Sequence, residues 1–343
     1  MRARTRRLVS TIAGVTLASA AFGVVVSSFT PTGVFTGILA GTAIGLVLAM
    51  LGVSTGGEAV RRWPVAVVLL LRTVVYGAVF LVIPTVMFAL VQGSLEPFRH
   101  PLSVVTGTTL ALSFGFGLII NFALTVTRLL GPQTMMSFIT GRYHRPRREQ
   151  RIVLFLDLAE STNLAEKLGD ARFHGFLNRV FWDITEPVLE AGGEFYRYVG
   201  DEVIVTWTER AGAAGAAVAC IFAIEDALAR RRDDYLTCFG AAPRFRAALH
   251  AGPLVVGEMG DVKREIVLLG DTMNTAARIE NVCRASRHDV IASAPAMPRR
   301  EALPPNVRAE SLGAVELRGK EIMTELFALT RPPTVHAGHI PKS

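Results

Sequence analysis

The sequence predicts a membrane-spanning helical region followed by an α/β sandwich, in which a mostly antiparallel sheet is backed by helices. Hydrophobic residues make up 50% of the 343 residues, and their excess is concentrated in roughly the first 130 positions. The remainder alternates short apolar runs with amphipathic helical patterns. Turn residues between pairs of these runs are typical of hairpins, which favours an antiparallel sheet.

Four N-terminal segments are long and apolar enough to cross roughly 30 Å of hydrocarbon as helices. Their only charged residue is Arg72, in the third segment, close to the basic end of that span. We therefore expect Arg72 to extend toward the lipid headgroups, and Asn121 to form an interhelical hydrogen bond. Abundant Gly, Ala, Ser and Thr favour close helix packing and dimerisation. The predicted spans are 8–29, 33–53, 65–91 and 102–127.

Arginine residues are distributed unequally on the two sides of the predicted spans. The loops at 30–32 and 92–101 contain only Arg99, whereas the other side contains many. The positive-inside rule then places both chain ends in the cytoplasm, in a multi-pass protein of the inner cell membrane. The cytoplasmic arginines are Arg2, Arg4, Arg6, Arg7, Arg61, Arg62, Arg142, Arg145, Arg147 and Arg148.

An alternative for the first span is a cleaved signal peptide ending near Ala20. The apolar run continues nine residues beyond Ala20, which favours an uncleaved span. The scarcity of charge inside the spans argues against a transporter.

The net charge of +7 comes mostly from residues beside the predicted spans, where anionic lipids attract basic side chains. We therefore expect the lipid bilayer, and no nucleic acid, as the partner of this charge. The three cysteines, Cys220, Cys238 and Cys283, lack metal-ligand spacing and fit reduced cytosolic thiols.

Composition divides the chain into a membrane domain (1–130), a basic juxtamembrane linker (131–150), a cytosolic domain (151–330) and a flexible tail (331–343). Within the third part, helices are predicted over 161–168, 171–190 and 210–231, and from Asp271 onward. Strands are predicted over 152–156, 193–199, 202–207, 244–251 and 254–258, with a last strand pair within 313–329.

Two aspartates occupy the ends of predicted strands. Asp157 follows a fully apolar strand, and Asp201 lies in a hairpin turn 44 residues later. If the hairpin lies beside the first strand, both carboxylates meet at one edge of the sheet. Such hard oxygen ligands suit Mg²⁺ or Mn²⁺ shared with substrate phosphates. Ser161 and Thr162 open the next helix, whose free N–H groups favour phosphate binding.

A third motif carries Asn274 and Arg278 on one face of a helix, because they are four residues apart. The guanidinium group presents a fixed fork of donors to phosphate, and the Asn amide can hold a ribose. Taken alone, such a pair is usually a solvated helix surface.

Together, FLDLAEST, YRYVGDE and LLGDTMNTAARIE resemble the catalytic domain of the class III nucleotidyl (adenylate/guanylate) cyclases. The resemblance covers about residues 150–330 and implies a ferredoxin-like α+β domain. It further implies that Asp157 and Asp201 bind two Mg²⁺ or Mn²⁺ ions, and that Asn274 and Arg278 act on the transition state. Arg318 matches a basic position that touches the terminal phosphates in relatives.

The run GGEF at 192–195 is also found in diguanylate cyclases. Those enzymes share a related sheet, but they do not need the helix that carries Asn274 and Arg278. We interpret GGEF as the turn into the first strand of the hairpin.

Two positions depart from the family pattern for base recognition. Adenylate cyclases of the family have Lys where this chain has Arg197, and commonly Asp or Thr where it has Val267. Arg is only a donor, so it can address a ring nitrogen of adenine but cannot accept from the N1–H of guanine. Val267 offers nothing to the 6-amino group of adenine, for which a backbone carbonyl could serve instead. ATP is therefore favoured over GTP as the substrate.

These features predict a membrane-bound adenylate cyclase that converts ATP to 3′,5′-cyclic AMP and pyrophosphate by two-metal catalysis. In the family, metal ligands and transition-state residues come from different protomers. We therefore expect a homodimer formed through the cyclase domain and the membrane helices, with possible control by the membrane domain. The alternatives are a guanylate cyclase and a catalytically silent membrane scaffold.

Overall fold

The structure is a computed structural model that describes residues 3–27, 30–54, 63–93, 107–319 and 323–331. It divides into two compact units, Met1–Met136 and Ser137–Ser343. The division falls within the range predicted as a linker, where α8 (Pro132–Thr140) is followed by the first residues of β1 (Arg147–Leu158). The predicted tail beyond residue 331 lies outside the described residues.

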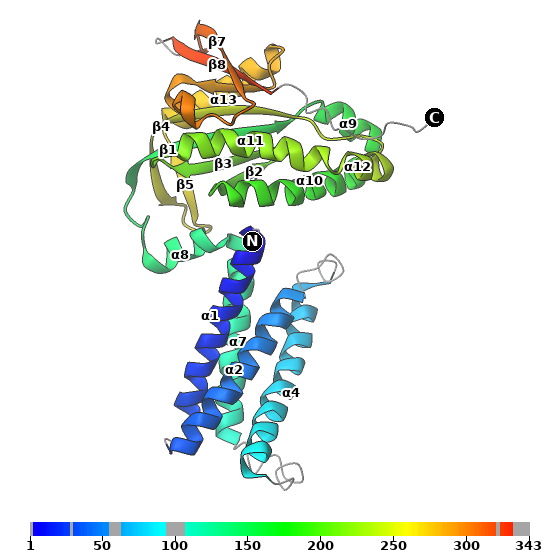
Figure 1. Ribbon diagram of the computed structural model, residues 1–343, viewed down its shortest axis with the longest axis vertical. Helices are drawn as coiled ribbons and strands as arrows, with labels where there is room; N and C mark the ends of the chain where they lie inside the picture. The colour runs from blue at the N-terminus through cyan, green and yellow to red at the C-terminus, as the bar shows by residue number, and fades with distance from the viewer. Residues whose placement is uncertain (1–2, 28–29, 55–62, 94–106, 320–322, 332–343) are drawn as a thin grey trace. The chain divides into compact units, whose positions relative to one another are not determined.

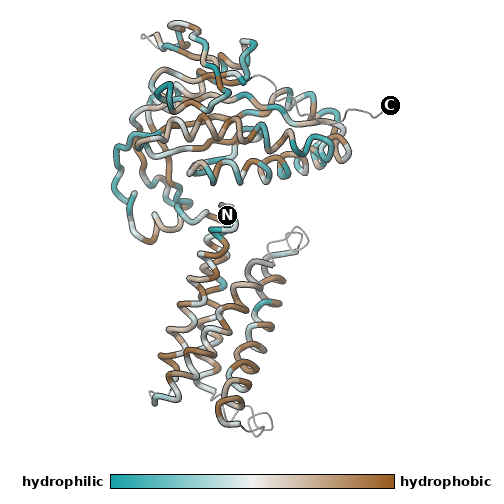
Figure 2. Tube along the Cα trace, viewed as in Figure 1, coloured by the Kyte–Doolittle hydropathy of each residue, from teal (hydrophilic) through white to brown (hydrophobic). Residues whose placement is uncertain are grey.

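The first unit consists of long apolar helices (Figure 1), which the hydropathy colouring shows as largely hydrophobic along their length (Figure 2). By length and composition, four stretches could cross a membrane: Arg4–Val26, Pro31–Met50, Leu70–Val91 and Gly107–Leu130. They lie within α1 (Ala3–Val26), α2 (Pro31–Ser54), α4 (Val65–Gln92) and α7 (Gly107–Leu130). The four predicted spans are confirmed as helices where the structure describes them, and residues 28–29 and 102–106 of these spans lie outside the described residues.

Arg72 is buried in the helix bundle, with 8% of its surface exposed. Its Nη1 donates a hydrogen bond to Asn121 Oδ1 at 2.9 Å, which joins α4 to α7. The expected interhelical bond of Asn121 is thus confirmed. The expectation that Arg72 extends toward the headgroups is wrong, because its guanidinium group turns inward to this amide.

Glycines set the close approach of α1 and α2. A Cβ atom on Gly41 would overlap the backbone oxygen of Ser19, and one on Gly45 would lie 2.6 Å from Thr16 Cα. Gly23 and Gly37 face one another in the same way. Small residues at these positions allow the two backbones to pack directly, as in other membrane helix pairs.

Replacing Gly41 with Leu is expected to destabilise the membrane unit, because overpacking typically costs about 1–3 kcal/mol. The measurement is the melting temperature of the full chain in detergent. Gly14→Leu is the matched control, since a Cβ there meets nothing within 4 Å. Equal melting temperatures for the two variants would contradict direct α1–α2 packing.

The second unit is built on an eight-stranded mixed sheet in the order β2-β3-β1-β4-β6-β8-β7, with β5 paired to β4. Neighbouring strands run antiparallel except for β4 and β6, which are parallel. The strands are β2 (Glu194–Val199), β3 (Glu202–Thr208), β4 (Phe245–Met259), β5 (Glu265–Leu269), β6 (Val290–Ser293), β7 (Arg308–Val315) and β8 (Thr324–Thr330).

Helices cover the two faces of this sheet (Figure 1). On one face, α10 (Asp170–Glu190) and α11 (Ala213–Ala229) pack together against alternate residues of β1, including Leu154 and Leu156. On the other face, α13 (Asp271–Ala285) packs against Val153 and Phe155. Because successive strand residues point to opposite faces, this alternation places Asp157 on the α13 side. The predicted sandwich of a largely antiparallel sheet and helices is confirmed.

Several details differ from the prediction, and α8, β5 and β6 were not predicted. The expected strands 244–251 and 254–258 form one continuous strand, β4, because Pro253 is accommodated opposite Gln150 without ending the pairing. The predicted helix 210–231 is shorter, and a separate helix, α12 (Arg232–Phe239), follows it. The remaining helices, including α9 (Ser161–Leu168), lie close to their predicted positions.

Candidate active site

A row of charged residues crosses three neighbouring strands at one end of the sheet. Asp157 of β1 is directly opposite Glu202 of β3 on one side and Arg246 of β4 on the other. Residues opposite one another in a ladder share a face, so all three side chains lie on the α13 side. Asp157 is only 3% exposed. The register thus buries a carboxylate at the end of an apolar strand.

Asp201 immediately precedes Glu202, in the turn between β2 and β3. Gly200 has a φ of 63°, a left-handed conformation that glycine adopts without strain. This turn brings Asp201 next to the strand position opposite Asp157. The two aspartates singled out from the sequence therefore lie together at the same end of the sheet.

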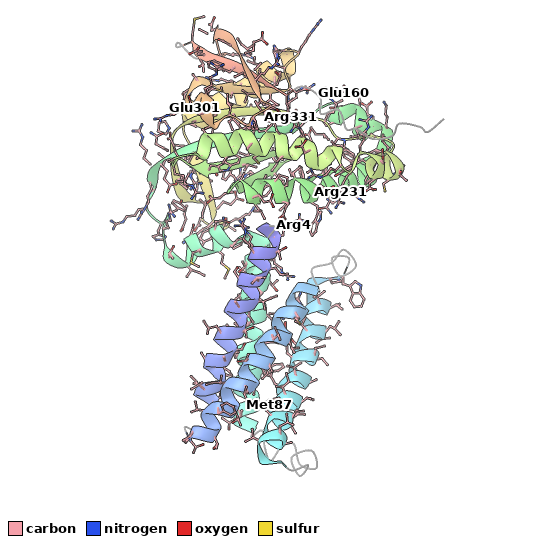
Figure 3. The ribbon with its side chains drawn as sticks, viewed as in Figure 1. Arg4, Met87, Glu160, Arg231, Glu301 and Arg331 are labelled. Carbon is pink, nitrogen blue, oxygen red and sulfur yellow. The ribbon has the colours of Figure 1, made fainter. Side chains whose placement is uncertain are left out.

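The connection from β1 to α9 is short. Glu160, labelled in Figure 3, has a φ of 61° and precedes the first helical residue, Ser161. Ser161 and Thr162 thus form the first turn of α9, four and five positions after Asp157. Backbone N–H groups of a first helical turn are available to an anion.

Two arginine side chains form ion pairs with Asp157. Arg284 Nη2 of α13 lies 3.1 Å from Asp157 Oδ1, and Arg246 Nη1 lies 3.9 Å from Oδ2. Arg284 also forms an ion pair with Glu280 one turn earlier, at 2.5 Å.

Burial is the main cause of two raised pKa values in this cluster. The pKa of Asp157 rises from 3.8 to about 6, with further contributions from Glu280 and Asp201 that Arg284 opposes. The pKa of Glu202 rises from 4.5 to about 7, through burial and then the charges of Glu280 and Asp157. Burial therefore disfavours the charged forms of Asp157 and Glu202, and the neighbouring carboxylates add to this effect.

Asn274 and Arg278 lie on α13, but not on the face that contacts Asp157. That face carries Glu280 and Arg284, and helical geometry places the Asn274–Arg278 pair about 120° around the axis from it. Arg278 Nη1 instead donates a hydrogen bond to the backbone oxygen of Gly319 at 3.3 Å. The predicted transition-state residues and the predicted metal ligands therefore face in different directions within one chain.

Gly319 belongs to the same turn as Arg318, which is exposed, so the Arg278 contact brings this turn beside the Asn274–Arg278 face. Arg197 and Val267 lie on β2 and β5, and the two strands meet where Leu268 N–H donates to Tyr196 Oη at 3.1 Å. Arg318 is thus placed beside Arg278, and Arg197 and Val267 lie on two strands that contact each other.

The donor set at Asp157 fits divalent cations. Carboxylate oxygens are the ligands that Mg²⁺ and Mn²⁺ prefer, and Asp157 has a raised pKa mainly because burial disfavours its charged form in the metal-free protein. Among the residues that the structure describes, no three or more His, Cys, Asp or Glu side chains gather as a metal cage. Further ligands would therefore come from substrate oxygens and water.

Sequence patterns did not single out Glu202, Arg246, Glu280 or Arg284 as parts of this cluster. A signal for two of them was present, since Glu280 and Arg284 have the i,i+4 spacing of a helical ion pair. Arg246 becomes recognisable only from the β1–β4 register.

These features describe an α/β domain with paired acidic side chains at one end of its sheet. Residues 144–330 match the family described as the Adenylate and Guanylate cyclase catalytic domain. This match covers more than half of the chain, and the protein belongs to that family.

Two relatives that the chain resembles are named adenylate cyclases. The chain is 42% identical over 212 residues to Adenylate cyclase 2 of Rhizobium meliloti (strain 1021), a match covering 62% of this chain and 58% of the relative. It is 26% identical over 137 residues to Adenylate cyclase of Anabaena cylindrica, covering 38% and 27% of the two chains. The chain therefore spans less than two thirds of the length of either relative.

The structure of a bacterial light-regulated adenylyl cyclase has the same fold. The two superpose with a TM-score of 0.55 at 20% identity, over 65% of each chain. At this identity the likeness concerns the fold alone.

Asp157→Asn is expected to stabilise the metal-free protein. The pKa of about 6 against 3.8 corresponds to roughly 3 kcal/mol of unfavourable charge burial. The unfolded carboxylate keeps its ordinary pKa, so this penalty is complete above about pH 6 and disappears as the pH falls toward about 4. In EDTA, the variant should therefore melt several degrees above wild type near pH 7.5, with a smaller difference near pH 5.

The control for this measurement is Asp289→Asn, which alters an exposed carboxylate paired with Arg244 at 3.1 Å. It should show no such gain. A melting temperature of Asp157→Asn that stays at or below wild type at both pH values would contradict the buried-charge interpretation.

Proposed function

We propose that the protein is a membrane-anchored adenylate cyclase that converts ATP to 3′,5′-cyclic AMP and pyrophosphate. The observation that carries this proposal is the buried Asp157 with Asp201 beside it at the sheet edge, together with Asn274 and Arg278 on α13. The 42% identity to a relative named Adenylate cyclase 2 supports the choice of ATP.

In this reaction the ribose 3′-oxygen bonds to the α-phosphorus, and the bond from that phosphorus to the bridging oxygen of the β-phosphate breaks. The 3′-hydroxyl proton is released, and pyrophosphate leaves. Two Mg²⁺ or Mn²⁺ ions would supply activation of the hydroxyl and neutralisation of the phosphates. Asp157 and Asp201 are the residues that would hold them.

The chain's own side chains account for positioning and charge stabilisation. Asn274 would hold the ribose so that its 3′-oxygen is in line with the leaving group. Arg278 would donate hydrogen bonds to the α-phosphoryl oxygens as negative charge develops there. The first turn of α9, with Ser161 and Thr162, and the exposed Arg318 would bind the phosphate chain.

A homodimer would bring the two sets of residues to one substrate. Within one protomer, the helix face with Asn274 and Arg278 is turned about 120° away from the face that contacts Asp157. A two-fold partner would present its own Asn274–Arg278 face to the metal ligands, which gives two equivalent sites. The site is incomplete without the second copy.

The apolar helices of the first unit would anchor the enzyme with both ends in the cytoplasm, as the arginine distribution favours. Close packing of small residues would suit helices that also control the geometry of the dimer.

Product analysis tests this function. Purified full-length protein with Mn²⁺ should convert ATP to cyclic AMP, with GTP converted poorly, when products are separated by chromatography. Asp157→Ala and Asp201→Ala should each lower turnover by at least about a hundredfold, since each removes a proposed metal ligand. Formation of cyclic GMP in preference to cyclic AMP would favour a guanylate cyclase, and no cyclic product would favour a silent scaffold.

Mixing two inactive variants tests the shared site. Asp157→Ala and Arg278→Ala should each be inactive alone, but a mixed dimer retains one intact site. Co-expressed with different affinity tags and purified through both, the mixed dimer should recover up to about half of wild-type activity. Purified mixed dimers without activity would contradict sites shared between protomers.

A further inference from the structure

A carboxylate lies beside the residue expected to contact the purine base. Arg197 Nη2 of β2 is 2.5 Å from Glu265 Oε2 of β5, and Lys263 Nζ is 2.6 Å from the other oxygen, Oε1. The Arg197 and Glu265 side chains are 43% and 39% exposed, so a ligand can reach both. No role for Glu265 follows from the sequence motifs alone.

The β2–β5 contact holds this pair together although 68 residues separate its members. Leu268 N–H donates to Tyr196 Oη, and the Arg197 guanidinium carbon lies 5.4 Å from the centre of the Tyr196 ring. Both ends of the ion pair are therefore fixed by neighbouring strand residues.

Glu265 lies two residues before Val267 on the same strand, and β5 pairs regularly with β4 across both positions. Alternation along a strand places residues two apart on one face. Val267 has no group that can hydrogen-bond to a base. Glu265 supplies an acceptor on that face, next to the donor Arg197.

We propose that Glu265 is a specificity-determining residue that accepts a hydrogen bond from the 6-amino group of adenine, while Arg197 donates to the ring nitrogen N1. This inference rests on the proposed cyclisation of ATP. Glu265 would thus supply the hydrogen-bond acceptor that Val267, on the same strand, lacks.

The pair matches adenine atom by atom. On adenine, N1 is an acceptor and the adjacent 6-amino group is a donor, which complement a guanidinium and a carboxylate. Guanine reverses both groups, with N1–H and a 6-oxo oxygen. In the same pose, guanine would set donor against donor at Arg197 and acceptor against acceptor at Glu265.

Lys263 and Arg197 further favour the ionised, accepting form of the Glu265 carboxylate. The hydrogen bond and charge of Lys263, followed by the charge of Arg197, lower the pKa of Glu265. An ionised carboxylate is an acceptor only, with lone pairs left for the amino group after both cations have bound.

The test removes the interacting group from each side in turn. Wild-type protein and Glu265→Ala are assayed with ATP and with purine riboside 5′-triphosphate, which has hydrogen in place of the 6-amino group. Wild type should prefer ATP by about tenfold in kcat/KM, as expected for a partly exposed hydrogen bond to a charged group. In Glu265→Ala, kcat/KM for ATP should fall by about that factor, while kcat/KM for the analogue should change little, so the preference for ATP should vanish.

Asp289→Ala is the matched control, because it breaks another exposed arginine–carboxylate pair, Arg244–Asp289, on strand-flanking residues. It should retain the wild-type preference for ATP. Melting temperatures of all variants verify that they are folded.

An equal decrease in kcat/KM for ATP and for the analogue in Glu265→Ala would overturn the inference. A purely structural role of Glu265 would lower kcat/KM for both substrates. An unchanged kcat/KM for ATP would overturn the inference as well. Cyclisation of ATP by the wild type keeps the proposed function intact in both cases. If wild type fails to cyclise ATP, the proposed function falls first.

Discussion

The antiparallel register of β1 with its two neighbours is the constraint on which the site depends. It places Asp157 opposite both Glu202 and Arg246, and it brings the turn containing Asp201 to the same end of the sheet. A shift of one residue in β1 would turn Asp157 to the face covered by α10 and α11. The close packing of different side chains on the two faces of β1 opposes such a shift.

The same register buries the Asp157 carboxylate, which costs free energy in the metal-free protein but prepares the site for cations. A carboxylate that is 3% exposed beside three other acidic groups is destabilising in the absence of a divalent cation, although Arg284 and Arg246 offset part of the charge. Binding of metal ions with a polyphosphate would relieve this repulsion. A site that is unfavourable in the metal-free protein and favourable in the complex is typical of a functional rather than a structural carboxylate cluster.

Much of the fold could be predicted because its signals are local. The four apolar spans, the strand ending at Asp157 and the Gly200–Asp201 turn each follow from composition or turn chemistry within a short window. The helix with Asn274 and Arg278 could be placed for the same reason. Contacts between distant segments could not be predicted in this way.

Arg72 illustrates this limit, because its inward turn depends on Asn121, 49 residues away. Arg246 and Glu265 illustrate it in the second unit. Arg246 joins the acidic row only through the β1–β4 pairing, and Glu265 meets Arg197 only because β5 reaches β2. A single motif position, Val267, indicated a missing acceptor, but not where on the strand a replacement lies.

The proposed function links these local and distant features through one geometric claim: metal ligands from one protomer act with the α13 face of its partner. The most direct measurement is the structure of the wild-type protein with Mn²⁺ and a non-cyclisable ATP analogue. We predict anomalous Mn²⁺ peaks about 2.0–2.3 Å from the carboxylate oxygens of Asp157 and Asp201, with the nucleotide also contacted by Arg278 of the partner subunit. Peaks remote from these carboxylates, or a nucleotide bound within a single protomer, would contradict the account.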